Sequence, residues 1–295
     1  MERSEMDSVR FGVTTFPTDY GLPVQELAKA VEERGFDSLF FNEHTHIPVS
    51  RRTTFPGGGE LPLEYMRTHD PFVALTVAAC VTRRIMLGTG ICLIAQRDPI
   101  LLAKEVASLD RVASGRVILG IGAGWNAEEM ANHGTPFKRR WGILRERVLA
   151  IREIWSRDVA QFHGQFVDFE PLWSWPKPVQ NPGPKVLLGS RSGRCFDRVI
   201  EYCDGWMPIG IPGREQELAN GINELRLRCE AMARSIDSLE LAAIGLPADR
   251  EVALRHMEIG FKHLIFSSPV ADRDASIRAL DRCAAVVSSL RASIS

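Results

Sequence analysis

The sequence lacks the cysteine and hydrophobic patterns that would place a protein outside the cell or in a membrane. Six cysteines are scattered through 295 residues, and no two of them form a CxxC pair. Disulfide frameworks and zinc knuckles need such pairs, so we expect free thiols in a reducing compartment. No apolar run approaches the roughly 18 residues of a membrane span, and residues 1–9 hold no signal-peptide core. We therefore expect a cytoplasmic protein.

The sequence also lacks a dominant charge. Its 36 Lys and Arg residues nearly balance 37 Asp and Glu residues, which gives a formal net charge of -1. Such a chain has no overall field that would recruit nucleic acid or an anionic membrane. The apolar content of 45% allows a sizeable core. We expect a globular protein whose partner is a small-molecule substrate.

What the chain does contain is a regular alternation of strand-like and helix-like segments. The β-rich segments span 10–16, 36–44, 84–93, 115–125, 184–190, 205–210, 238–245 and 262–268. Helical periodicity follows each of them, over about 21–35, 71–82, 138–156, 191–203, 213–235, 247–259 and 273–291, and in a helix that starts at Asp98-Pro99 and carries Leu102, Val106 and Leu109. Eight such units predict a parallel α/β barrel of the TIM type, (β/α)8, with a doubly wound open sheet as the alternative.

Two of the strand-to-helix connections are long. Residues 45–70 and 125–183 are rich in Pro, Gly and aromatic residues, and both leave the carboxyl end of a predicted strand. Enzymes with a parallel barrel build their sites at that end. We interpret both segments as insertions that form walls or lids within a single domain, 1–295, since no linker or internal repeat is visible.

The fifth predicted strand runs into a loop of small polar residues. The loop consists of Gly189, Ser190, Arg191, Ser192 and Gly193. Glycine lets a backbone approach a ligand closely, and the start of a helix supplies N–H groups that bind phosphate. The loop therefore predicts a phosphate site, and the alternative is an ordinary helix cap.

Glycines also mark the ends of the third and fourth predicted strands. In GIGAGW (120–125), the turn Gly122, Ala123 and Gly124 differs from the dinucleotide fingerprint, because its third glycine comes one residue early. In LGTGICL (87–93), interior glycines beside Thr89 and Ile91 indicate a bulge or close ligand approach. Tight turns and close strand–helix packing are the alternatives.

The second predicted strand ends in FNEHTH (41–46), which brings Glu43, His44 and His46 together. Histidine is the usual acid or base near neutral pH, and a carboxylate can orient it. His44 and His46 also have the spacing of metal ligands. A metal site needs further ligands, and no other strand end offers an evident His or Asp. We therefore expect no metal, although a metal-dependent hydrolase remains an alternative.

Taken together, these segments resemble the bacterial luciferase-like superfamily of flavin and deazaflavin barrel enzymes, and in particular its branch that uses coenzyme F-420. The longest matching stretch is RIMLGTGICLIAQRDPILLAKEVASLDRVASGRVILGIGAGW (84–125). Shorter ones include ERGFDSLFFNEH, PFKRRWGILRERVLAIREIW, PKPVQNPGPKVLLGS and CDGWMPIG, and the likeness covers about residues 9–210.

The resemblance implies a planar cofactor ring in the barrel mouth, with its phosphate at residues 189–193. It implies a non-prolyl cis peptide at Gly90-Ile91, behind the ring, with Thr89 before it. The turn from Gly122 to Gly124 would flank the cofactor. His44 would donate a proton or orient the substrate as hydride is transferred, with Glu43 tuning it.

In one position the sequence departs from the resemblance. Members that oxidise sugar phosphates carry a Glu after the strand-four glycines, whereas this chain has Trp125. We therefore expect a flatter or more hydrophobic substrate, in a pocket lined by Trp125 and Phe55, to which Trp173 and Trp175 could contribute.

The expected function is F-420-dependent hydride transfer to or from an organic substrate. An FMN-dependent luciferase-like monooxygenase and a non-catalytic flavin-binding protein of the same fold are the alternatives. A homodimer is expected from the resemblance and because closed dimers are the commonest assembly.

Overall fold

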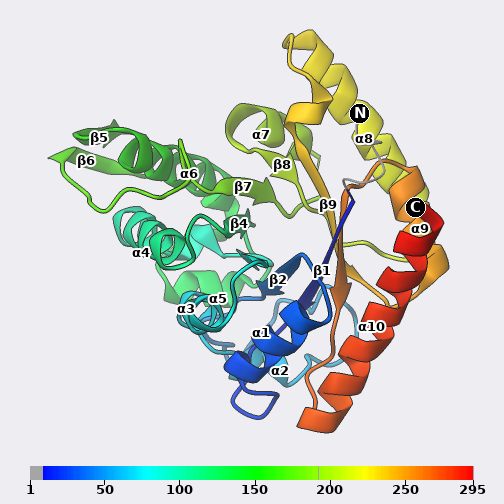
Figure 1. The fold of residues 1–295 in the computed structure, drawn as a ribbon. Coiled ribbons are helices and arrows are strands. Elements are labelled where there is room, and N and C mark those ends of the chain that lie inside the picture. The colour runs from blue at the N-terminus through cyan, green and yellow to red at the C-terminus, as the bar shows by residue number, and fades with distance from the viewer. Residues whose placement is uncertain (1–8, 192, 295) are drawn as a thin grey trace.

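The structure, a computed structural model, describes residues 9–191 and 193–294. Its barrel strands are β1 (Arg10–Thr15), β2 (Ser38–Phe41), β3 (Met86–Thr89), β4 (Val117–Ile121), β7 (Lys185–Leu188), β8 (Gly205–Trp206), β9 (Glu240–Leu246) and β10 (His263–Ser267). They close in the order β1-β10-β9-β8-β7-β4-β3-β2 with every pair parallel (Figure 1). Each strand overlaps a predicted segment, so the (β/α)8 prediction is confirmed and the open sheet is wrong.

Helices surround the barrel and return the chain from one strand to the next (Figure 1). They are α1 (Val24–Glu33), α2 (Glu64–Arg67), α3 (Pro71–Val81), α4 (Pro99–Val112), α5 (Ala127–Asn132), α6 (Arg140–Ser156), α7 (Cys195–Tyr202), α8 (Glu215–Ala231), α9 (Arg250–Glu258) and α10 (Arg273–Ile294). Short 3-10 helices span Ile94–Gln96, Phe137–Arg139 and Ile236–Ser238. The short helices α2 and α5 lie in the two predicted insertions, whereas the others pack on the barrel.

Local sequence signals explain where helices begin and end. The Asp98 carboxylate accepts a hydrogen bond from the Leu101 amide, and Pro99 occupies the first turn of α4. An acidic N-cap followed by proline satisfies free N–H groups and fixes the first φ angle. After α1, Gly35 adopts a φ of +74°, which only glycine reaches at low cost. These predicted boundaries are confirmed.

The hydrophobic core has two layers. A small cluster fills the barrel itself, and its buried members are Phe40, Ile118, Leu187, Met207, Ala242, Ile244 and Ile265. A larger cluster lies between the strands and the helices. Because bulky side chains fill the interior, the barrel is a packed core and not a pore. A ligand of this fold must therefore bind at the strand ends.

The segment after α6 corrects part of the prediction for the second insertion. It contains an antiparallel pair that was not predicted, β5 (Ala160–His163) and β6 (Asp168–Leu172). The Gln180 side chain then donates to the Val117 carbonyl at 2.8 Å, and Val117 is the first residue of β4. Because α6 runs back along the barrel, residues 157–183 lie at the amino ends of the strands. Only the first part of 125–183 lies at the mouth.

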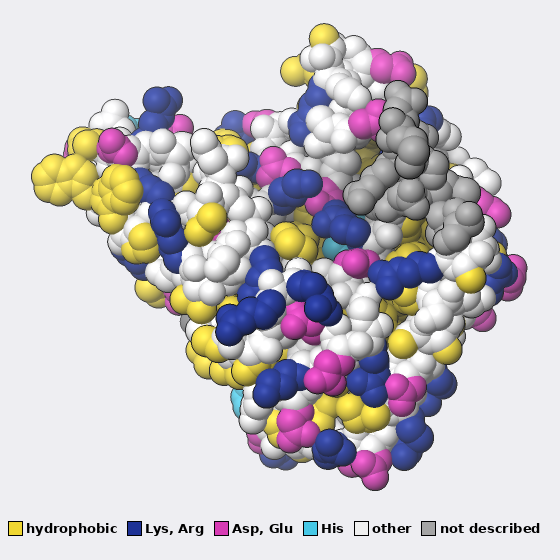
Figure 2. Space-filling view, viewed as in Figure 1, with side chains coloured by type: hydrophobic (Ala, Val, Ile, Leu, Met, Phe, Trp, Pro, Cys, Tyr) yellow, Lys and Arg dark blue, Asp and Glu magenta, His cyan; other side chains and the backbone are white. Residues whose placement is uncertain are grey.

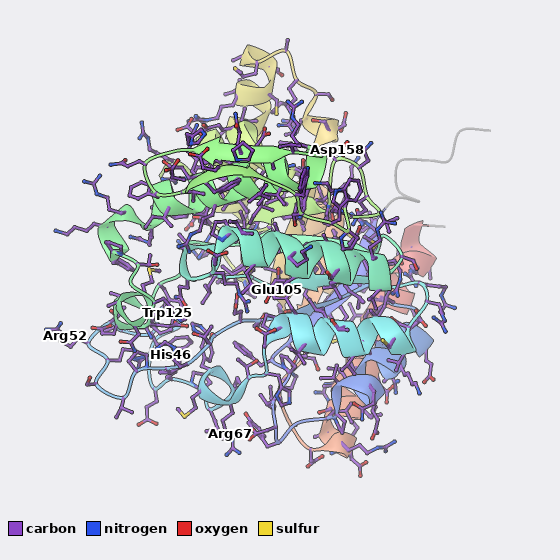
Figure 3. The ribbon with its side chains drawn as sticks, turned by 90° about the vertical axis from the view of Figure 1, so that its left-hand side faces the viewer. His46, Arg52, Arg67, Glu105, Trp125 and Asp158 are labelled. Carbon is purple, nitrogen blue, oxygen red and sulfur yellow. The ribbon has the colours of Figure 1, made fainter. Side chains whose placement is uncertain are left out.

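Figure 3 displays this separation, with Trp125 and His46 on one side of the molecule and Asp158 on the other. Hydrophobic side chains gather at the left-hand tip in Figure 2, where Figure 1 places β5 and β6. Trp173 and Trp175 follow β6 and are 80% and 54% exposed. The suggestion that they contribute to the substrate pocket is therefore wrong.

All six cysteines are free, as predicted, and only Cys80 is exposed. No helix within residues 9–191 and 193–294 has the length and apolar character needed to cross a bilayer.

Candidate functional site

The carboxyl ends of β2, β3 and β4 bring predicted site residues together. Phe41 is paired with Thr89 in the parallel register, so the residues that follow each of them lie side by side. The Gly90-Ile91 peptide bond is cis, as predicted. The Thr89 hydroxyl donates to the Gly120 carbonyl at 2.7 Å and is buried, so Thr89 joins β3 to β4 beneath the mouth.

The Ile91 side chain lies across two predicted glycines. A Cβ placed on Gly189 would stand 2.6 Å from Ile91 Cγ2, and a Cβ on Gly122 would overlap Ile91 Cδ1. Only glycine fits at either position without moving Ile91. Gly124 takes a φ of +77° and Ala123 is buried, so the β4 turn is tight. The three strand ends therefore form one floor of backbone and one aliphatic side chain.

In the loop after β7, the carbonyl of Ser190 points toward the protein interior. The Ser190 carbonyl accepts hydrogen bonds from Trp206 Nε1 at 2.7 Å and from Cys195 Sγ at 3.0 Å. In a trans peptide the following N–H points the opposite way, so the Arg191 amide faces outward. Gly193 is exposed, and a Cβ there would meet only open space. Ser192, also predicted to bind the phosphate, lies outside the described residues.

Helix α7 begins next to this loop without a side-chain cap. The acidic residue of its first turn, Asp197, forms an ion pair with Arg228, so its carboxylate does not cap the helix. The free N–H groups and the helix dipole leave a partial positive charge at this end. An anion would be stabilised there.

Arginines without carboxylate partners surround the same helix. The guanidinium of Arg198 lies 4.0 Å from the Trp141 ring centroid, and Arg140 approaches the same ring at 5.9 Å. Burial lowers the pKa of Arg140, and the positive charge of Arg198 lowers it further. Burial lowers the pKa of Arg191 in the same way, and the positive charge of Arg214 lowers it further. An anion bound between these cations would relieve their mutual repulsion.

The predicted phosphate loop contains Arg191, whereas Arg140 and Arg198 were not among the predicted site residues. The nearby ion pairs join other groups, namely Arg145 with Glu201 and Arg214 with Glu217. Among the described residues, no carboxylate lies within ion-pair distance of Arg140 or Arg198. The signal in the sequence was the basic run at 138–140, which the fold places near α7.

His44 lies just beyond β2 in a buried pair with Glu129. His44 Nδ1 is 2.8 Å from Glu129 Oε2, and the side chains are 5% and 1% exposed. Asn126 accepts from the Glu129 amide and begins α5, which positions this carboxylate. The pair spans 85 residues of sequence, so no spacing rule could have identified Glu129.

Glu43 is turned away from His44 and has other partners. One of its oxygens accepts from the Leu93 amide at 2.6 Å, and the other pairs with Arg97 at 2.5 Å. Burial opposes the charge on Arg97, but Glu43 outweighs it and the pKa of Arg97 rises. Arg97 also pairs with Asp70, the N-cap of α3. Glu43 therefore fastens the end of β2 to the loop after β3.

Four rings form a closed circuit over the mouth. Neighbouring ring centroids are 5.1 to 5.9 Å apart, in the order His44, Tyr65, Phe55, Trp125 and back to His44. Phe55 and Trp125 were predicted to line the substrate pocket, whereas Tyr65 was not. Burial raises the pKa of Tyr65, so its hydroxyl keeps its proton. The circuit shields His44 with apolar surface.

The first insertion is fastened to α5. The Thr53 hydroxyl donates to Glu128 at 2.6 Å, and the Arg52 amide donates to the same carboxylate at 3.1 Å. The hydrogen bond from the Thr53 hydroxyl lowers the pKa of Glu128 most. Hydrogen bonds from backbone amides lower it further, to about 2. The ionised carboxylate thus holds the loop that carries Phe55.

His46 does not join His44 in a metal site. The strand ends at Phe41, so the two histidines do not share a strand face. His46 Nε2 contacts Asn132 at 2.8 Å, and Nδ1 contacts Thr45 at 3.0 Å. Among the described residues, no group of three or more His, Cys, Asp or Glu side chains could hold a metal ion.

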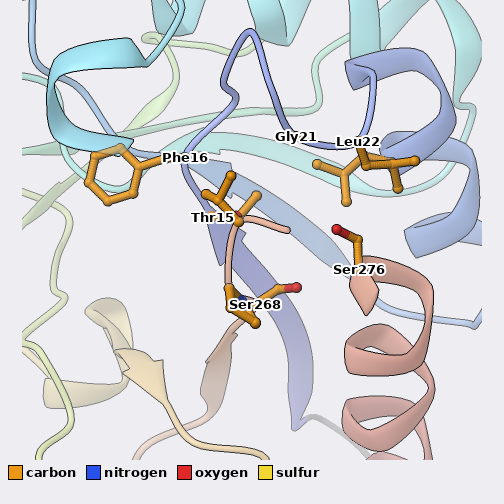
Figure 4. A pocket seen from close by; sticks show the side chains of 9 residues that line it. Thr15, Phe16, Gly21, Leu22, Ser268 and Ser276 are labelled. Atoms are coloured by element: carbon orange, nitrogen blue, oxygen red, sulfur yellow. The ribbon is translucent and has the colours of Figure 1, made fainter. Parts of the chain in front are cut away.

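A small cavity lies to one side, at the carboxyl ends of β1 and β10 (Figure 4). Its lining consists of Thr15, Phe16, Gly21, Leu22, Leu27, Ser268, Pro269, Val270 and Ser276. None of these side chains is ionisable at neutral pH, so the cavity offers no acid or base.

The chain is similar in sequence to known proteins over most of its length. A model of the family described as luciferase-like monooxygenase matches residues 17–282. The chain is 36% identical over 281 residues to an uncharacterized protein of Mycobacterium tuberculosis, covering 94% of this chain and 98% of the relative. It is 29% identical over 210 residues to an F-420-dependent glucose-6-phosphate dehydrogenase of Amycolatopsis mediterranei, covering 64% and 58% respectively.

Two solved structures share the fold. A monooxygenase from Streptomyces bottropensis superimposes with a TM-score of 0.76 at 18% identity, covering 95% of this chain and 99% of the other. The coenzyme F-420-dependent tetrahydromethanopterin reductase of Methanopyrus kandleri gives 0.75 at 15% identity, covering 94% and 97%.

Proposed function

The chain belongs to the luciferase-like monooxygenase family, and from this premise we propose that it is an oxidoreductase that transfers hydride between coenzyme F-420 and an organic substrate. The observation that carries the proposal is the group of arginines, Arg140, Arg191 and Arg198, beside the uncapped start of α7, which adjoins the glycine floor of the mouth. A relative at 29% identity is named as an F-420-dependent dehydrogenase, which supports the choice of cofactor.

The residues present fit a planar ring with an anionic tail. The missing Cβ atoms of Gly122 and Gly189 leave room for the Ile91 side chain, so a ring could rest on Ile91 and on backbone. The outward-facing Arg191 amide and the uncapped start of α7 suit a phosphate. Arg140 and Arg198 would neutralise further negative charge. When bound, the deazaflavin supplies or accepts hydride, which no side chain can do.

The protein's own contribution is to orient the reactants, exclude water and move a proton. His44 is the one imidazole of the aromatic circuit, and imidazole is the usual acid or base in proteins, so we assign the proton to it. Glu43 keeps the end of β2 in place through Arg97. Phe55 and Tyr65 cover His44 and reduce the access of water.

The same circuit supports an apolar, flat substrate. Trp125 presents one ring edge to His44, and Phe55 closes the other side. The Arg51 guanidinium lies 5.6 Å from the Trp125 centroid. An aromatic or unsaturated substrate could stack there, with a polar group toward Arg51.

The direct test is an equilibrium titration of the purified protein with F-420 and with FMN, followed by cofactor fluorescence. We expect F-420 to bind at least tenfold more tightly. Gly189→Val should weaken binding at least tenfold, because the new side chain displaces Ile91. Arg198→Gln should weaken it severalfold at low salt.

Arg145→Gln is the matched control, since Arg145 is nearby but already paired with Glu201. It should leave the affinity for F-420 unchanged. Tighter binding of FMN than of F-420 would refute the cofactor assignment. If Arg198→Gln and Arg145→Gln change the affinity for F-420 equally, Arg198 does not bind the anionic tail of the cofactor.

A second candidate is an FMN-dependent monooxygenase. It is favoured by the similarity in fold to the Streptomyces bottropensis monooxygenase. Reduced cofactor would then be consumed by oxygen in step with substrate, so an oxygen electrode separates the two functions. Under the F-420 proposal, substrate turnover continues at the same rate without oxygen.

We further propose a homodimer. Exposed apolar side chains lie on α3 and α4, among them Val73, Val77, Ile100 and Leu101. Large exposed side chains of this kind on adjacent helices suit a protein interface. Sedimentation velocity should give the mass of two chains, and a monomer at micromolar concentration would contradict the proposal.

A further inference from the structure

Glu129 is a buried carboxylate beside His44 at the mouth of the barrel, and it was not among the predicted site residues. We propose that Glu129 is a positioning residue for His44. It holds the proton of His44 on Nδ1 and so presents Nε2 to the substrate. The inference rests on the proposed hydride-transfer function, because that function is what requires a proton at His44.

The geometry of the pair supports this role. An ionised carboxylate can only accept hydrogen bonds, so we assign the hydrogen of the 2.8 Å contact to His44 Nδ1. The other ring nitrogen, Nε2, has no hydrogen-bond partner within the described chain. Fixing one nitrogen in this way determines the tautomer and the ring orientation.

Among the described residues, His44 is the only side chain that contacts the Glu129 carboxylate within hydrogen-bond distance. Its Oε1 atom is buried and makes no hydrogen bond, and the same holds for the neighbouring Asn126 Nδ2. A carboxylate of this kind is costly to bury unless it has a paired group. A purely structural acid would be expected to use both oxygens, as Glu43 does with Leu93 and Arg97.

The proton balance of the reaction gives the pair a task. Two-electron oxidation of an organic substrate releases a hydride, which goes to the oxidised cofactor, and a proton. The proton's bond to the substrate breaks as a new bond forms to Nε2 of His44. Glu129 then stabilises the imidazolium through Nδ1–H. In the reducing direction the same proton leaves Nε2 for the substrate.

The test uses the full-length protein, with Glu129→Gln and Glu129→Asp. The matched control is Asp168→Asn, since Asp168 forms an exposed pair with His163 at the similar distance of 2.7 Å. Long-range 15N NMR of the cofactor-free protein reports which nitrogen of His44 carries the hydrogen. Steady-state kinetics with F-420 then separate kcat from KM, and fluorescence gives the cofactor affinity.

We expect the wild type to show the Nδ1–H form of His44 and the Gln variant to lose it. The kcat of the Gln variant should fall about 10- to 100-fold, with cofactor affinity within twofold of wild type. The limb of the pH–rate profile that depends on His44 should move. The Asp variant should recover part of kcat, and Asp168→Asn should change neither kcat nor the His44 spectrum.

Several outcomes would overturn the proposal. A wild-type spectrum with the hydrogen on Nε2 would do so even if Glu129→Gln fails to fold. An unchanged kcat in a folded Gln variant would leave Glu129 a structural residue only. If the wild type neither binds nor uses F-420, the proposed function fails by itself, whereas the spectra still report on the pair.

Discussion

At the scale of single residues, Glu43 and His44 differ in role although they are neighbours in sequence. Both follow β2 and both are buried. Glu43 has both oxygens occupied by Leu93 and Arg97, whereas His44 keeps Nε2 without a partner in the described chain. A side chain whose groups are all satisfied stabilises the fold, and one with a free nitrogen can exchange a proton. We therefore place the proton transfer at His44 alone.

This assignment predicts the behaviour of His44→Ala. Hydride transfer should slow by about 10²- to 10⁴-fold, the usual contribution of a positioned acid or base. Cofactor affinity should change little, since His44 lies apart from the loop at 189–193. Stopped-flow bleaching of the cofactor measures the first quantity, and fluorescence titration the second.

His163→Ala on the exposed hairpin is the control and should behave as wild type. An unaltered transfer rate in His44→Ala would remove His44 from the mechanism. A loss of affinity equal to the loss of rate would make it a binding residue instead.

At the scale of elements, the first insertion and α5 act together as one cover. Residues 51–53 are fastened to the first turn of α5 by Glu128, and α5 also supplies Glu129 to His44. The cover brings Phe55 and Tyr65 over the mouth. Because the fastening consists of a few exposed and partly buried hydrogen bonds to one carboxylate, it can open without disturbing the core.

Glu128→Gln should loosen this cover. The neutral amide makes weaker bonds to Thr53 and Arg52 than the carboxylate does. Hydrogen exchange at residues 51–55 should speed up, and KM for the substrate should rise severalfold with kcat changed less than threefold. Hydrogen-exchange mass spectrometry and steady-state kinetics measure these effects.

The control is Glu217→Gln, which removes an exposed partner of Arg214 on another face. It should alter neither exchange at 51–55 nor KM. If Glu128→Gln leaves exchange at 51–55 as it was, Glu128 does not fasten the cover.

At the scale of the whole molecule, a buried ionic network closes the amino end of the barrel. Glu240 contacts Arg10 at 2.6 Å, His263 at 3.0 Å and Lys185 at 3.1 Å, and so ties β9 to β1, β10 and β7. Burial raises the pKa of Glu240, but His263 and the two cations outweigh burial and lower it to about 2. Burial lowers the pKa of His263, which is therefore neutral in the folded barrel.

Both shifts make the fold sensitive to acid. A carboxyl whose folded pKa is about 2 instead of 4.5 contributes stability above pH 4.5 and loses it as the pH falls toward 2. The contribution is about 3 kcal/mol. The neutral His263 adds to the loss, because the unfolded chain takes up its proton at a higher pH than the folded barrel does.

Glu240→Gln should lower the free energy of unfolding at pH 7 by about 3 kcal/mol, since it removes the negative charge that Arg10, Lys185 and His263 stabilise. The difference from wild type should shrink as the pH falls from 5 to 3. Urea unfolding at several pH values measures it, with the exposed Glu170→Gln as control. A difference that stays constant with pH would contradict the role of the Glu240 charge.

Much of the architecture could be read from the sequence because it depends on local patterns. Apolar runs fixed the eight barrel strands, and Asp98, Pro99 and Gly35 marked helix ends. The glycines at 90, 122 and 189 were predicted as site residues because glycine at a strand end lets a ligand approach the backbone closely. β5 and β6 were missed, since they are short, mostly exposed and only weakly alternating.

The sequence alone thus determined the barrel and the glycine positions at its mouth, and the resemblance to a known family implied the cis bond at Gly90-Ile91. Only the tertiary structure decided which side chains surround that floor. Glu129 reaches His44 across 85 residues, and Arg140 lies near Arg198 although they belong to different helices. Strand and turn patterns arise from neighbours in the chain. The partners of a charge are set by burial and distance after the barrel has closed, and no local pattern records them.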